Sequence, residues 1–209
     1  MSSALRHLPA KLILVLSACL SLAPVALAHH MEDGKMPETF AAGFLSGLAH
    51  PVIGMDHLSF ILLTGLITFT ITRRYLDPLL FLGLSLMGSL LQVYVGSLPG
   101  VEMIVALSVL VMLLMLWMHA KLARWSTPIM VVAGLFHGYA YGSAVVGTMI
   151  QPLVAYLIGF SLIQALLLYS FGQICAYLAQ KSPSSLETVE NIVSAVGSGV
   201  ALVYIVRAF

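Results

Sequence analysis

Charged residues are scarce in this chain. Of its 209 residues only 8% are Asp, Glu, Lys or Arg, whereas 60% are hydrophobic. The surface of a soluble domain needs roughly 25–35% charged residues, so the mean hydropathy of +1.04 indicates an integral membrane protein. The net charge of +1 and the lack of a basic run argue against nucleic acid as a partner.

Cysteine and nucleotide-binding motifs are also lacking. Cys19 falls in an N-terminal leader and Cys175 in a late apolar stretch, so the mature chain has neither a disulfide nor a thiolate metal motif. No GxxxxGK[ST] phosphate loop occurs, and therefore the chain does not hydrolyse nucleotide itself. Any uphill transport must draw on an ion gradient, the membrane potential or a separate protein. We expect no enzymatic activity and no tightly bound cofactor.

Residues 1–28 have the pattern of a cleavable signal peptide. Arg6 and Lys11 charge its start, residues 12–22 are apolar, and a small-residue cleavage site ends at Ala28. The apolar core is short, which favours removal, although an uncleaved signal anchor is the alternative.

Cleavage after Ala28 leaves residues 29–49 as an extracytoplasmic N-terminal segment that begins with His29 and His30. A free amine and two imidazoles can capture a divalent cation arriving from outside. The alternative is a solvated tail in which the two histidines are incidental.

Residues 50–209 form the predicted transmembrane domain. A span needs ~20 mainly apolar residues, and short connections favour a compact bundle of antiparallel neighbours. A surface helical turn over residues 40–48 precedes the first span. The six predicted spans are residues 50–71, 78–98, 102–117, 128–147, 152–179 and 189–206.

Basic residues predict the orientation of this bundle. If the chain starts outside, the loops after spans one, three and five face the cytoplasm, whereas the outer side has only Lys35 and Arg207. This distribution agrees with the positive-inside rule and predicts that both mature termini are extracytoplasmic. The cytoplasmic loops hold Arg73, Arg74, Lys121, Arg124 and Lys181.

Ionisable groups open the first span. His50, Asp56 and His57 are costly in hydrocarbon and therefore mark a functional site. On a straight helix the two histidines lie roughly 10 Å apart, so one ion contacts both only if the backbone bends, as Pro51 and Gly54 allow. The groups are either gathered by such a bend or form two successive stations along a path. A further alternative is that the histidines only cap a helix at the membrane interface.

Two more ionisable groups lie in later spans. His137 lies ~15 Å into the fourth span, near the midplane of the bilayer, whereas His50 and His57 are expected near the outer surface. Glu102 opens the third span at the expected level of Asp56. Nitrogen and carboxylate ligands suit nickel, cobalt or zinc.

The eight residues from His50 to His57 resemble the HPxxGxDH signature of the HupE/UreJ family of bacterial membrane proteins. The segment 136–142 is similar to the second signature of that family, FHGxAHG, but has Tyr141 where the family has its later histidine. Pro99 to Glu102 resembles a PGxE pattern. The resemblance implies a protein of the bacterial inner membrane associated with nickel or cobalt uptake.

The leading hypothesis is a secondary or potential-driven permease that imports nickel or cobalt, with membrane lipid and the ion as partners and a homo-oligomer as one possible assembly. The predicted metal-binding residues are His29, His30, His50, Asp56, His57, Glu102 and His137. The possible pathway residues are Tyr139, Tyr141 and Tyr169. These three tyrosines occupy positions where members of the family commonly have polar or histidine residues.

Two alternatives stand beside the permease. A haem-binding membrane oxidoreductase subunit needs axial histidine pairs at matching depth, and His137 is expected to have no such partner. A hydrogenase or urease metallocentre accessory membrane protein without transport is separated from a permease only by a flux measurement.

Overall fold

The computed structural model describes residues 36–118 and 123–207. All regular elements in these two ranges are helical, which confirms the predicted all-α class. The predicted signal peptide, His29 and His30 lie outside the described residues. The α-helices are α2 (Phe40–Ile53), α3 (Met55–Ile67), α4 (Asp77–Val95), α5 (Val101–Met118), α6 (Ser126–Gly142), α7 (Ile150–Lys181) and α8 (Pro183–Arg207), with a π-helix η3 (Thr68–Thr72) and the 3₁₀ turns η5 (Ala123–Trp125) and η6 (Ser143–Val145).

Six segments in the described ranges are long and apolar enough to cross a membrane, as hydropathy predicted. Their bounds agree with the predicted spans to within a few residues, except that the first span begins later, and the fourth and the last begin earlier, than predicted. The last starts at Pro183, a residue suited to the first turn of a helix. The six segments are Met55–Thr72, Asp77–Val95, Val101–Met118, Ala123–Val145, Ile150–Lys181 and Pro183–Arg207.

The predicted first span, residues 50–71, is not one continuous helix, because the chain breaks at Gly54. The backbone of Gly54 is extended, with φ −71° and ψ 97°, and it separates α2 from α3. Pro51 lies in the last turn of α2, where its missing N–H removes one helical hydrogen bond and weakens that turn. The break therefore falls inside the ionisable motif itself.

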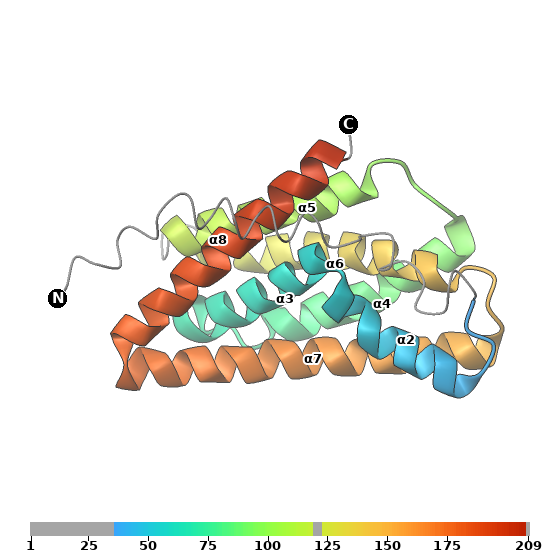
Figure 1. Ribbon diagram of the computed structural model, residues 1–209, viewed down its shortest axis with the longest axis horizontal. Coiled ribbons are helices and arrows are strands. Elements are labelled where there is room, and N and C mark those ends of the chain that lie inside the picture. Colours follow the sequence, from blue (N-terminus) through green and yellow to red (C-terminus); the bar gives the residue numbers. More distant parts are fainter. Residues whose placement is uncertain (1–35, 119–122, 208–209) are drawn as a thin grey trace.

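The helical turn predicted over residues 40–48 is present, but it is longer than predicted, runs to Ile53 as α2 and packs on a neighbouring helix. A Cβ atom on Gly47 would overlap the carbonyl oxygen of Tyr156, and one on Gly65 would lie 2.5 Å from that of Leu168. Small residues thus let α2 and then α3 approach the same helix, α7, closely. Figure 1 shows α2 and α3 following one another along α7.

Helices α4 and α6 form a second close pair. A Cβ atom on Gly138 would overlap the carbonyl oxygen of Ser85. The Ser85 hydroxyl donates to the Gly134 carbonyl at 3.1 Å, and that of Ser89 donates to the Gly138 carbonyl at 2.9 Å. The glycine ladder of α6 therefore serves close helix packing.

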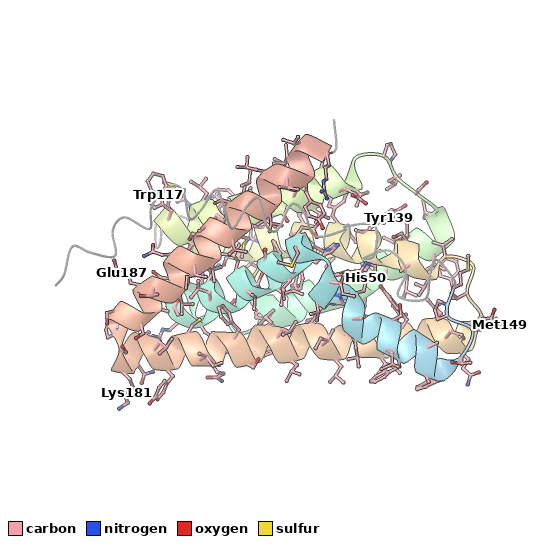
Figure 2. All side chains as sticks on the ribbon, in the orientation of Figure 1. His50, Trp117, Tyr139, Met149, Lys181 and Glu187 are labelled. Carbon is pink, nitrogen blue, oxygen red and sulfur yellow. The ribbon has the colours of Figure 1, made fainter. Side chains whose placement is uncertain are left out.

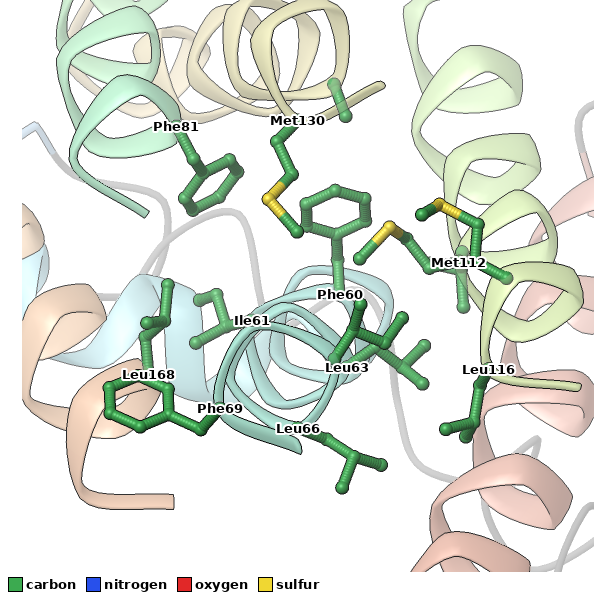
Figure 3. Packing of buried hydrophobic residues seen from close by; sticks show 14 of the residues in the cluster. Phe60, Ile61, Leu63, Leu66, Phe69, Phe81, Met112, Leu116, Met130 and Leu168 are labelled. Atoms are coloured by element: carbon green, nitrogen blue, oxygen red, sulfur yellow. The ribbon is translucent and has the colours of Figure 1, made fainter. Parts of the chain in front are cut away.

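Helix α3 lies at the centre of the bundle. Its segment has the largest buried share of the six candidate spans, and Figure 3 shows its apolar side chains meeting those of neighbours on several sides. Phe60 and Leu63 are completely buried. The neighbours contribute Phe81 from α4, Met112 from α5, Met130 from α6 and Leu168 from α7.

Several of the predicted cytoplasmic cations gather at one end of the bundle, here called the basic end. The Arg74 guanidinium donates to the Thr127 hydroxyl at 3.3 Å, which joins the end of η3 to the start of α6. Arg124 precedes Thr127, and Lys181 closes α7. Buried Asp77 accepts hydrogen bonds from the hydroxyls of Ser126 and Thr127 at 2.9 and 2.8 Å. Lys121 is outside the described ranges.

Candidate functional site

The break at Gly54 brings the two histidines of the motif together. The ring centroids of His50 and His57 are 6.3 Å apart, with the rings edge to face, rather than the ~10 Å of a straight helix. A Cβ atom on Gly54 would lie 2.8 Å from Cδ2 of His57, so a larger residue has no space there. Of the two predicted arrangements, the gathered one is present. Figure 2 shows His50 near the junction of α2 and α3.

His57 and His137 are in direct contact. Their Nδ1 atoms are 2.9 Å apart, and both rings are buried. We predicted His57 and His137 at different depths, with no histidine beside His137, and this prediction is wrong. His57 lies at the start of the first membrane-length segment and His137 lies toward the C-terminal end of α6, so packing of the helices brings the two rings to one level.

Ser108 assigns the tautomer of His137. The single hydroxyl proton of Ser108 is donated to the carbonyl of Val105 at 2.7 Å. The 2.8 Å bond between Ser108 Oγ and His137 Nε2 therefore needs Nε2–H as the donor. Neutral His137 then carries its lone pair on Nδ1, and the Nδ1–H of His57 is the donor between the two rings.

Tyr156 assigns the tautomer of His50. Its phenol proton is donated to the carbonyl of Tyr141 at 2.9 Å. The 2.9 Å bond between Tyr156 Oη and His50 Nδ1 is then donated by His50. The lone pair of the neutral His50 ring is consequently on Nε2. In both rings, a hydroxyl from another helix assigns the nitrogen that can accept.

Tyr141 lies among the histidines. Its ring stacks on His57, with centroids 4.1 Å apart and planes at 28°, and meets the ring of His50 edge to face at 5.1 Å. The Tyr141 hydroxyl is buried and has no hydrogen-bond partner among the described residues. Burying an unsatisfied polar atom is costly, so a ligand or water that bonds this oxygen would be favoured.

Asp56 places a negative charge at the break. Its carboxylate is buried, and Oδ1 accepts the backbone N–H of His57 at 2.9 Å. The carboxylate lies in the first turn of α3, where the helix dipole favours an anion. The negative charge beside the imidazoles suits a cation at this point.

Glu102 lies apart from this cluster. It is exposed in the first turn of α5, six residues before Ser108, which contacts His137. That separation is about 9 Å along the helix. The common level of Glu102 and Asp56 stays a prediction.

The other predicted pathway tyrosines have packing contacts. Tyr139 donates its hydroxyl to the Gly96 carbonyl, which holds α6 to the end of α4. Tyr169 packs against Phe69, with ring centroids 5.8 Å apart. Within the two described ranges, no three His, Cys, Asp or Glu side chains are close enough to share one metal ion as they stand.

Sequence reasoning missed three residues near this site. Ser108 had a weak signal, as a lone hydroxyl in an apolar run, whereas Tyr156 had none. Tyr204 of α8 lies close enough for the charges of Asp56 and Glu102 to act on its phenol.

We call His50, His57, His137 and Tyr141, with Asp56, the histidine cluster.

Six apolar helices around a buried histidine cluster at a helix break define a multi-pass membrane protein. Residues 17–204 match the family model described as HupE / UreJ protein, and the chain belongs to this family. Members are associated with nickel or cobalt uptake or with accessory roles for hydrogenase and urease, and they are not known enzymes. The predicted resemblance is confirmed.

A relative in Rhizobium leguminosarum bv. viciae, Protein HupE, is 30% identical to this chain over 128 residues. That match covers 60% of this chain and 63% of the relative, so the chain spans less than two thirds of the relative's length. No solved structure matches the chain.

Proposed function

We propose that this protein is a permease that imports a divalent transition-metal ion, nickel or cobalt, across the bacterial inner membrane. The histidine cluster is the proposed binding site in the middle of the path. The observation that carries the proposal is the 2.9 Å contact between the Nδ1 atoms of His57 and His137, beside the unpartnered Tyr141 hydroxyl.

The spacing of the two nitrogens supports a shared ion. With metal–nitrogen distances of about 2.1 Å, two adjacent ligands of an octahedral ion lie about 3.0 Å apart. The histidines need mainly to turn their lone pairs toward a common point. His57 must also lose its Nδ1 proton, or transfer it to its own Nε2, before it can bind a metal.

The surroundings favour a borderline divalent cation. Imidazole suits nickel, cobalt and zinc, and the carboxylate of Asp56 offsets positive charge. Broken helices are how many transporters form ion sites within the bilayer, since the break frees backbone groups and admits polar side chains. Glu102, His29 and His30 are proposed to attract the ion on the outer side, before it reaches the cluster.

The basic end is proposed to face the cytoplasm under the positive-inside rule, with both mature termini outside and the leader removed. An inward divalent cation then gains ~4.6 kcal/mol per 100 mV, from ~2.3 for each of its two charges. This energy supports accumulation without nucleotide hydrolysis.

The haem alternative rested on matching depth, and that reasoning needs correction. His57 and His137 do share a depth, but their nitrogens are hydrogen-bonded to each other. Axial ligands of one haem iron lie on opposite faces of a macrocycle, and these rings leave no space for one. The geometry therefore favours a small ion over haem.

Nickel uptake into sealed proteoliposomes tests the proposal. Wild-type protein should accumulate radioactive nickel when the interior is made negative, with cobalt competing better than calcium. Asp56→Ala and His57→Ala should abolish uptake, and Ser59→Ala, buried in the same turn of α3, should retain it. Wild-type vesicles that take up no more nickel than empty ones would refute the permease.

A further inference from the structure

Five buried oxygen atoms in the described part of the chain have no hydrogen-bond partner. A folded protein rarely leaves such atoms unsatisfied, because each has lost its water on burial. Only one of them, the Tyr141 hydroxyl oxygen, belongs to the histidine cluster. They are Thr64 Oγ1, Thr68 Oγ1, Gln92 Oε1, Tyr141 Oη and Gln164 Oε1.

Two of these atoms belong to residues on the same face of α3 as His57. Thr64 and Thr68 follow His57 by seven and eleven residues, which at 100° per residue places them within about 20° of it around the helix. They lie roughly 10 and 16 Å further toward the basic end. Both side chains are completely buried, and a hydroxyl in lipid normally bonds to a carbonyl of its own helix or of a neighbour.

Gln164 lies at an intermediate level on α7. One turn before it, Phe160 meets the Tyr141 ring edge to face at 4.8 Å. One turn after it is Leu168, whose carbonyl Gly65 of α3 approaches closely. Gln164 is fully buried, and its amide nitrogen donates to the Phe160 carbonyl at 3.3 Å. Its oxygen therefore falls between the level of the cluster and that of Thr64.

Gln92 lies on the other side of the histidine cluster, away from the basic end. A Cβ atom on Gly142, next to Tyr141, would lie 2.6 Å from Cβ of Gln92. This contact places Gln92 near the end of α4 that is remote from the basic end. The unpartnered oxygens thus occur on both sides of the histidine cluster.

We propose that the oxygens of Gln164, Thr64 and Thr68 form the inner half of the metal path, a hydrated segment that carries the ion from the histidine cluster to the basic end. This inference rests on the proposed function. Hydroxyl and amide oxygens are weak ligands for nickel or cobalt, so they replace water around the ion without retaining it, as conduction requires.

The π-helix fits the inner end of this segment. Thr68 is its first residue, and its carbonyl accepts the N–H of Arg73 at 2.9 Å across the wider turn. Single π-helical turns are frequent at functional sites. The path then reaches the basic end beside Arg73.

Cysteine accessibility tests the path without relying on transport. In full-length protein carrying Cys175→Ala, Thr64→Cys and Thr68→Cys should react with methanethiosulfonate ethylammonium at least tenfold faster than Leu63→Cys and Ile67→Cys. These controls lie on the same helix and are equally buried. Nickel should slow the labelling of Thr64→Cys and Thr68→Cys but not that of the two controls. Equal rates at all four positions would overturn the path.

A second experiment separates the path from the permease itself. Thr64→Val and Thr68→Val keep the side-chain shape and remove the unsatisfied oxygen, so the unfolding temperature should rise or stay the same. The maximal rate of nickel uptake should fall at least tenfold while the dissociation constant for nickel is unchanged. Unchanged uptake in both variants would overturn the path and leave the permease standing. Fast labelling of Thr64→Cys and Thr68→Cys, together with a wild-type protein that transports no nickel, would support the hydrated segment and refute the permease.

Discussion

The Nδ1 atoms of His57 and His137 are 2.9 Å apart, although 80 residues separate them in the chain. His57 lies in the first turn of α3, just after the break at Gly54, and His137 lies within α6. Their contact places the two family signatures in one buried site. A neutral pair can share only one proton at this point, so a cation that replaces the proton meets two nitrogens already at ligand spacing.

The two histidines should act as one unit in metal binding. His57→Ala and His137→Ala are each expected to weaken nickel binding at least ~100-fold, and the double variant should be no more than a fewfold weaker than either, because contacting residues are not additive. Isothermal titration of purified protein measures the cycle, with Ser59→Ala as control. Losses that simply add would contradict a shared ion.

Ser108 should position His137 rather than bind metal. Ser108→Ala removes the acceptor that holds the Nε2–H tautomer, and loss of such a second partner typically costs ~10–100-fold in metal affinity. Ser108→Thr should restore most of the affinity. The matched control is Ser161→Ala, since that hydroxyl bonds only a carbonyl of its own helix. Titration with nickel measures all three, and an unchanged Ser108→Ala affinity would refute the assigned tautomer role.

Tyr156 should contribute to stability through its hydroxyl. Tyr156→Phe leaves the Nδ1–H of His50 and the carbonyl of Tyr141 without this partner in a buried place, at a cost of ~1–3 kcal/mol. A lower unfolding temperature in detergent is the expected result. Tyr177→Phe, an exposed position on the same helix, controls for loss of a phenol. Equal temperatures for the two variants would contradict the role of the hydroxyl.

Close packing of α4 against α6 should make Gly138 intolerant of a methyl group. Gly138→Ala brings a Cβ atom onto the Ser85 carbonyl and forces the helices apart, so we expect a loss of at least ~2 kcal/mol. Gly83→Ala on α4 meets nothing within 4 Å and should be neutral or stabilising by ~0.5–1 kcal/mol. Thermal unfolding in detergent compares them, and similar midpoints would argue against the packing.

Local features of the chain were sufficient for much of the architecture. Hydropathy predicted six apolar segments, and loop charges predicted one basic end, because both properties depend on residues close together in sequence. The motif from His50 to His57 identified the family and half of the site. Pro51 and Gly54 indicated that a bend was possible.

Tertiary packing decided the rest. Only the packing of the helices brings His57 of α3 to His137 of α6, and only neighbouring helices place Ser108 beside His137 and Tyr156 beside His50. The same packing leaves Glu102 about 9 Å along α5 from the residue that contacts His137. The sequence pattern shows which residues are too polar for lipid. Which helices touch, and at what level, depends on how closely small residues let their backbones approach.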